Sequence, residues 1–298
     1  MKRHIVFPLD FDSRAYLLKE PGEHWEESAK KLHFENQAKL IEELRVELGE
    51  LNFEQKLQNF KDAGQSPSSI ISHHNILYRQ ARYAFIYGFY YPALTSACAL
   101  GERVFNHLIL DLRDNYRSTP IYKEIYRIQS FQDWGDTIKI LAGWGVFQHP
   151  DIEPEFHKLK EMRMRSIHFN PETSKNLRSD ALAALSYVAL IIHLQFGTAA
   201  GQKWMIDGTK GAFFIKKDAE QDPFIAKYYL PQCPLVGPYY AMNFNQEGHW
   251  LFFDWNNYDN REISDEEFAK LFKDKTPEQR APTSVPVAAN VHVHTIVR

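Results

Sequence analysis

Residues 73–91, HHNILYRQARYAFIYGFYY, and the proline that follows them decide the fold of the largest part of this chain. The stretch predicts a helix that ends before Pro92. Proline suits the first turn of a helix, so Pro92 predicts that a second helix begins there. One apolar stripe follows that second helix: Leu94, Ala97, Cys98, Gly101, Val104, Phe105, Leu108, Ile109 and Leu112. Two consecutive helices of this kind indicate a helical bundle.

Further helices are predicted on both sides of this pair. They cover about residues 25–48, 53–64, 121–128, 134–144, 154–167 and 179–196. The last one is apolar almost all round, which places it at the centre of a bundle. Its apolar run, about residues 181–194, is expected to be too short to span a membrane. The predicted fold class is therefore mainly α, with a bundle over 67–200 and a helical extension over 1–66.

The pattern of residues changes after Gly201. Short aromatic runs separated by Gly, Pro and Asn predict strands over residues 211–217, 224–230, 237–244 and 249–255. Ser264 and Glu267 have the spacing of a capping box and predict a short helix. The tail begins near Thr276 and contains VHVHTIV, which could pair as an edge strand. Residues 201–298 are thus predicted to form a small β-rich appendage.

The composition of the chain limits the kinds of function that it can have. The chain has 298 residues and a net charge of −3, so any binding to phosphates must come from a local patch. Two distant cysteines make no disulfide framework and fit a reducing compartment. Asp10 and Asp12 close behind the first apolar residues argue against a signal peptide, and they are expected to be exposed turn acids. We expect a cytoplasmic protein without a bound cofactor or metal.

Arg163 is the most informative charged residue. It falls on the apolar stripe of the helix over 154–167, and an arginine facing a core needs a partner. Glu102, at the edge of the stripe described above, is the best candidate. His168 follows five positions later, and Asn170–Pro171 ends the helix there, because a residue before proline is disfavoured in helices.

The sequences YAFIYGFYYPALTSACALGERVFNHLI (83–109) and KLKEMRMRSIHF (158–169) resemble the HEPN superfamily of helical domains, often found in prokaryotic defence and toxin systems. The resemblance covers roughly residues 70–196. The signature of the family is Arg, four to six residues, then His, which Arg163 and His168 match. Active members often have a polar residue after the arginine, and this chain has Met164 there.

The resemblance implies a metal-independent endoribonuclease that acts as a homodimer, with a role in defence or stress response. Arg163 and His168 would be its catalytic residues, and Glu102 would orient Arg163. Histidine suits proton transfer near neutral pH, and a guanidinium suits the developing charge on a phosphate. The RNA backbone would contact the nearby basic side chains, which are Lys160, Arg165, Lys175 and Arg178.

Other readings of these residues stay open. Arg163 and Glu102 could form an interhelical ion pair with no chemistry, and His168 could bond a free carbonyl at the helix end. The bundle would then be a non-catalytic interaction or sensing module, with the β-rich segment binding a protein partner or a small ligand. A metal-dependent enzyme is a third reading, although His73–His74 is better explained as a polar helix start.

Overall fold

The computed structural model describes residues 1–7, 12–167, 175–198, 201–244, 250–254, 258, 261–274 and 294–296. The protein is mainly α, with small antiparallel sheets, as the sequence predicted. The chain divides into two compact units, which are described separately. Residues 10–197 form the helical unit, and residues 1–9 together with 198–298 form the mixed unit.

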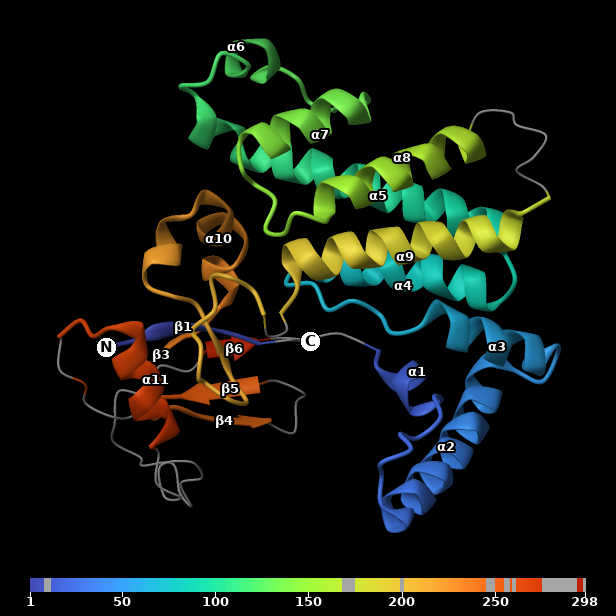
Figure 1. Ribbon diagram of the computed structural model, residues 1–298. Helices are drawn as coiled ribbons and strands as arrows, with labels where there is room; N and C mark the ends of the chain where they lie inside the picture. Colours follow the sequence, from blue (N-terminus) through green and yellow to red (C-terminus); the bar gives the residue numbers. More distant parts are fainter. Residues whose placement is uncertain are drawn as a thin grey trace. The chain divides into compact units, whose positions relative to one another are not determined.

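The helical unit contains nine of the helices among the described residues. They are α1 (Arg14–Leu17), α2 (Glu27–Leu48), α3 (Phe53–Ala63), α4 (Ser72–Ile86), α5 (Tyr90–Leu112), α6 (Tyr122–Ile125), α7 (Trp134–Gly143), α8 (Ile152–Ile167) and α9 (Leu177–Phe196). Helices α4, α5, α8 and α9 pack side by side and form the bundle (Figure 1). Helix α7 covers one side of α5 and α8.

Helix α5 is the central element of the bundle. All nine residues of the predicted apolar stripe are buried, and they face the neighbouring helices. The predicted boundary before it needs a correction, because α4 ends at Ile86 and not just before Pro92. Gly88 has a φ of +84°, a left-handed conformation that glycine adopts without strain and that commonly ends a helix. Helix α5 therefore begins at Tyr90, and Pro92 lies in its first turn.

Helix α9 packs against α3, α4, α5 and α8, but it is exposed at Ser186, Leu190 and His193, so it is not enclosed on all sides as its sequence predicted. The apolar run predicted to be too short belongs to a helix of 20 residues, which by length and composition alone could cross a membrane. The core helix of a bundle meets the same criteria. Eight residues of α9 are buried, and they are Ala181, Ala184, Leu185, Val188, Ile191, Ile192, Gln195 and Phe196.

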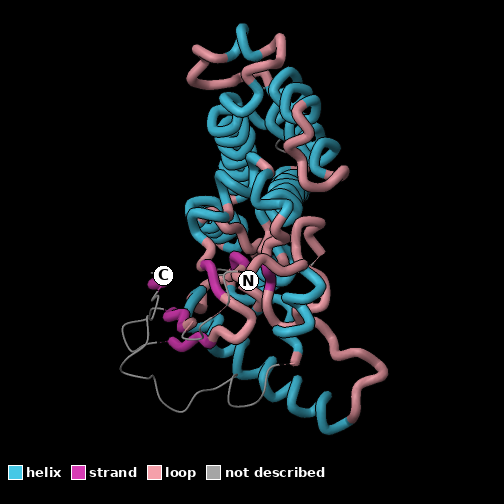
Figure 2. The backbone as a smooth tube through the Cα atoms, turned by 90° about the vertical axis from the view of Figure 1, so that its left-hand side faces the viewer, coloured by secondary structure: helices cyan, strands magenta, loops and turns pink. Residues whose placement is uncertain are grey.

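The mixed unit holds two small antiparallel sheets, whose strands are magenta in Figure 2. The first has the order β2 (Phe213–Phe214), β1 (Arg3–Val6), β3 (Leu235–Val236), and the second has the order β4 (Ala241–Phe244), β5 (Trp250–Phe253), β6 (His294–Ile296). The segment VHVHTIV thus supplies the edge strand that the sequence suggested. One apolar core joins side chains of both sheets with Phe268 of helix α11 (Asp265–Lys273).

One predicted strand of this unit is wrong. Residues 224–230 lie mostly in a helix, α10 (Pro223–Tyr228). Asp222 accepts a hydrogen bond from the Phe224 backbone N–H at 2.8 Å, and Pro223 occupies the first helical position. A side-chain cap followed by proline is a strong start signal for a helix, and it outweighs the β propensity of the aromatic run.

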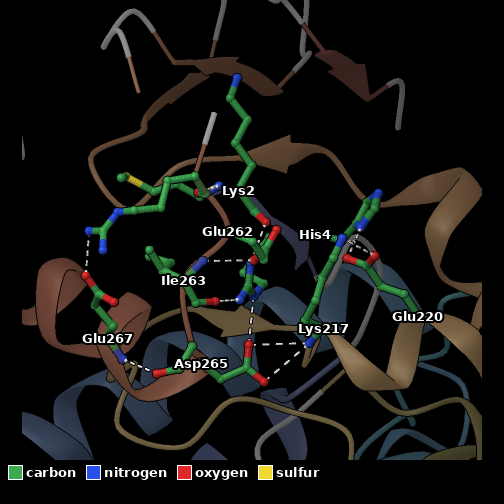
Figure 3. Close-up of polar contacts among 12 residues, drawn as sticks. Lys2, His4, Lys217, Glu220, Glu262, Ile263, Asp265 and Glu267 are labelled. Carbon is green, nitrogen blue, oxygen red and sulfur yellow. Dashed lines mark hydrogen bonds and ion pairs between the residues drawn. The ribbon is translucent and has the colours of Figure 1, made fainter. Parts of the chain in front are cut away.

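The amino-terminal strand is joined to α11 by Arg3. Its guanidinium is fully buried and donates to Asp265 at 2.7 Å, to Glu262 at 2.6 Å and to the Ile263 carbonyl at 2.5 Å. Figure 3 shows the acceptor groups of these residues gathered at the start of α11. The predicted cap of that helix is present, since the Ser264 hydroxyl accepts from the Glu267 N–H at 3.1 Å.

Candidate functional site

Arg163 on α8 forms the predicted ion pair with Glu102 on α5. The distance from Arg163 Nε to Glu102 Oε2 is 3.1 Å, and the two side chains are 23% and 29% exposed. Trp134, the first residue of α7, donates from its indole N–H to the same Glu102 oxygen at 3.2 Å. The Arg163 guanidinium also lies over the Trp134 ring, 5.8 Å from its centroid. Three helices therefore hold Arg163 in one direction.

The close approach of α5 and α8 depends on Gly101. A Cβ at this position would lie 2.4 Å from Cδ2 of Leu159, which is itself fully buried. The same Cβ would lie 3.2 Å from the Trp134 ring. Glycine at the residue before Glu102 thus lets the helices come close enough for the ion pair to form.

A buried thiol lies next to the pair. Burial raises the pKa of Cys98 to about 12, although a hydrogen bond with Ser166 and the charge of Arg163 act in the opposite direction. A thiol with this pKa is protonated at neutral pH and makes a poor nucleophile. Cys98 is therefore a packing residue of this site.

His168, the second predicted catalytic residue, lies outside the described residues, as do Asn170 and Pro171. The described part of α8 nevertheless ends close to α5. The Tyr91 hydroxyl donates to the carbonyl of Ser166 at 3.4 Å, and Ser166 is buried. The helix turn that directly precedes His168 is thereby held in place.

Two of the basic residues predicted to bind RNA form ion pairs with acidic side chains. Arg165 pairs with Asp180 of α9 at 2.6 Å. Arg178 donates to Asn59 at 3.0 Å and pairs with Asp62, so it ties α9 to α3. Acidic partners thus neutralise both of these arginines.

Of the two predicted lysines, Lys160 lies on α8 and Lys175 lies just before α9. Lys160 Nζ lies beside the start of α7, 3.0 Å from the place where a Cβ of Gly135 would be. Lys175 is exposed. The bonds from backbone N–H groups of α7 and the charge of Lys160 hold the pKa of Asp133 below its ordinary value. Lys160 and Arg163 consequently both face α7.

A cluster of histidines was not anticipated from the sequence. The rings of His73 and His74 on α4 lie near that of His107 on α5, with centroids 5.3–6.2 Å apart. Burial, with the neighbouring His73 and His107, lowers the pKa of His74 to about 3, so that its ring is neutral. Within the described residues, no group of three His, Cys, Asp or Glu side chains is arranged to hold a metal ion.

Asp12 also differs from expectation. It was predicted to be an exposed turn acid, but it is half-buried and accepts from Arg14 at 3.0 Å and from Arg82 at 2.9 Å. Burial alone would raise the pKa of Asp12, but these arginines hold it below its ordinary value. Arg82 is the reason for the difference, since it reaches Asp12 across 70 residues of sequence.

Comparison with models of protein families, with curated proteins and with solved structures gives no match. The class that the structure defines is a mainly α protein with small antiparallel sheets.

Proposed function

We propose that the helical unit is a HEPN-like domain and acts as a metal-independent endoribonuclease, with Arg163 and His168 as catalytic residues and Glu102 as the positioning residue. The observation that supports this proposal most strongly is the Arg163–Glu102 pair on the turn of α8 that precedes His168. The proposal includes a cytoplasmic homodimer, in which two such motifs face one RNA strand.

The geometry of the pair leaves Arg163 able to bind a phosphate. The contact to Glu102 uses Nε, and within the described residues the two Nη groups have no hydrogen-bond acceptor. A partly exposed guanidinium with two available Nη groups can donate two parallel hydrogen bonds to phosphate oxygens. Glu102 and Trp134 limit the freedom of the side chain, which reduces the entropy lost on binding.

The proposed reaction is an internal transesterification followed by release of one RNA fragment. One His168 removes the proton from a ribose 2′-OH, and the oxygen forms a bond to the adjacent phosphorus. The bond from phosphorus to the 5′ oxygen of the next nucleotide breaks. The second His168 of the dimer gives a proton to that leaving oxygen, while Arg163 stabilises the charge on the phosphate.

The test is cleavage of mixed cellular RNA by the full chain in EDTA. We expect His168→Ala to lose about a hundredfold or more of the rate, the usual effect of removing a general acid or base. The matched control is His157→Ala, since His157 is an exposed histidine on the same helix and its loss should leave the rate unchanged. Intact RNA with the wild-type protein, or full activity in His168→Ala, would contradict the proposal.

A second candidate function is a non-catalytic interaction or sensing module, which binds a protein partner through the mixed unit. Its support is the neutralisation of Arg165 by Asp180 and of Arg178 by Asp62, which weakens any attraction to an RNA backbone. Under this alternative the wild-type protein leaves RNA intact and shows no salt-dependent RNA binding. Fluorescence anisotropy with labelled RNA at two salt concentrations separates the two candidates.

A further inference from the structure

Tyr91, in the first turn of α5, presents an aromatic ring beside the candidate site. Its hydroxyl donates to the Ser166 carbonyl at 3.4 Å, so the side chain reaches across to the last turn of α8. The residue is nevertheless 50% exposed. An exposed aromatic side chain that is held at its polar end offers a flat apolar surface to a ligand.

Tyr91 and Arg163 lie along the same line of contact between two helices. Helices α5 and α8 lie side by side and antiparallel, because Glu102 of α5 pairs with Arg163 while Tyr91, nearer the start of α5, reaches Ser166 (Figure 1). Between these contacts, Cys98 bonds with Ser166 and lies within range of the charge of Arg163. In the sequence, Ser166 is two positions before His168, so Tyr91 contacts the part of α8 that leads to the second proposed catalytic residue.

We propose that an unpaired RNA base stacks on the Tyr91 ring, which makes Tyr91 a substrate-binding residue that favours single-stranded RNA. This inference rests on the proposed function, because it takes RNA as the ligand. In a duplex the faces of each base are covered by its neighbours, whereas an unpaired base can turn outward and stack on an aromatic side chain. The proposed transesterification likewise favours a flexible single strand, since the 2′ oxygen must line up with the leaving 5′ oxygen.

The two kinds of group on this line of contact match the two parts of a nucleotide. Arg163 offers guanidinium donors to a phosphate, and Tyr91 offers a ring face to a base. A tyrosine side chain has only two rotatable bonds that move its ring, and the contact with Ser166 restricts them. Little conformational entropy is therefore lost when a base stacks on Tyr91.

The test is fluorescence anisotropy of the full chain with a labelled single-stranded RNA and with a labelled hairpin duplex. Fluorine replaces the ribose 2′-hydroxyls of both probes, so that neither can be cleaved. We expect the wild type to bind the single strand more tightly. Tyr91→Leu should weaken binding of the single strand about tenfold, the usual effect of losing one stacked base, and leave binding of the duplex unchanged. Tyr91→Phe keeps the ring and should bind as the wild type does.

The matched control is Tyr126→Leu. Tyr126 is 41% exposed and directly follows α6, which packs against the turn after the far end of α5. This variant should bind both probes as the wild type does. The melting temperature of each variant checks that it is folded.

Three results would overturn the inference: no preference of the wild type for the single strand, unchanged binding in Tyr91→Leu, or an equal loss in Tyr91→Phe. The last result would assign the effect to the contact with Ser166 instead of the ring. The ribonuclease proposal fails separately, since cleavage of unmodified RNA tests it. Binding that depends on Tyr91, with no cleavage, would support base stacking and contradict the ribonuclease. Cleavage with unchanged binding in Tyr91→Leu would contradict base stacking alone.

Discussion

Arg3 in the mixed unit and Arg163 in the helical unit both pair with carboxylates, but their surroundings differ. Arg3 is fully buried, and its Nε, Nη1 and Nη2 atoms all donate to Asp265, Glu262 or a carbonyl. Arg163 is 23% exposed and meets its carboxylate through Nε alone. The guanidinium of Arg3 thus uses all its hydrogen-bond donors within the protein, whereas that of Arg163 keeps donors for a ligand.

This difference indicates which arginine serves the stability of the fold and which can serve function. A saturated, buried guanidinium has no donor left for a ligand, and its removal leaves buried acceptors without a partner. A partly exposed guanidinium adds less stability but can bind an incoming anion. We therefore expect the substitution of Arg3 to affect folding, and that of Arg163 to affect function.

The largest expected effect is that of Arg3→Gln. Removing one partner of a buried charge network typically costs about 3–5 kcal/mol, and Asp265 would lose its hydrogen-bond donor. Chemical denaturation of the full chain measures the loss in the mixed unit. The control is Arg261→Gln, an exposed arginine paired with Glu267, which should change the free energy of unfolding by less than about 0.5 kcal/mol. An equally small loss of stability in Arg3→Gln would contradict the expected difference between Arg3 and Arg163.

Gly101→Ala tests the packing that places Arg163. The added Cβ meets the buried Leu159 side chain, and overpacking of a core costs about 1–3 kcal/mol. Gly143→Ala is the matched control, since a Cβ there meets nothing within 4 Å. Alanine at such a site stabilises by about 0.4–1 kcal/mol. Thermal unfolding of the two variants should therefore shift in opposite directions, and a stabilising Gly101→Ala would show that α5 and α8 are less closely packed.

The pH dependence of stability tests the buried His74. The unfolded chain binds a proton at this residue near pH 6.5, while the folded chain does so only near pH 3, because burial lowers its pKa. Stability is therefore lost as the pH falls, by about 2 kcal/mol between pH 7 and pH 5. His74→Gln should remove this part of the pH dependence, whereas His157→Gln, at an exposed position, should retain it. The free energy of unfolding of both variants is measured by urea denaturation at several pH values. If it depends on pH equally in the two variants, the assignment to His74 is contradicted.

The smallest expected change in stability is that of Arg163→Gln. A partly exposed ion pair contributes about 1 kcal/mol or less, so urea denaturation should detect little loss. Arg165→Gln, which removes a comparable pair with Asp180, provides the reference value. If Arg163→Gln instead lowers the free energy of unfolding by more than about 3 kcal/mol, Arg163 is a structural residue of the same kind as Arg3.

Several features could be predicted from short stretches of the sequence. The stripe of α5, the cap at Ser264 and the Arg163–Glu102 pair were all predicted and are present. Each depends on a spacing within one helix or on the need of a charge on an apolar face for a partner. The catalytic role of Arg163 and His168 stays a prediction.

Other features depend on residues far apart in the chain. Strand β1 pairs with β2 and β3, more than 200 positions later, and Arg3 reaches Asp265 across 262 residues. The histidine cluster likewise combines side chains from separate elements.

The sequence alone thus determined the long helices of the helical unit and which charges need partners, because helical periodicity and the cost of burying a charge act locally. Only the tertiary structure decided which distant groups meet. Many pairings satisfy the same local pattern, and the packing of the whole core selects one of them.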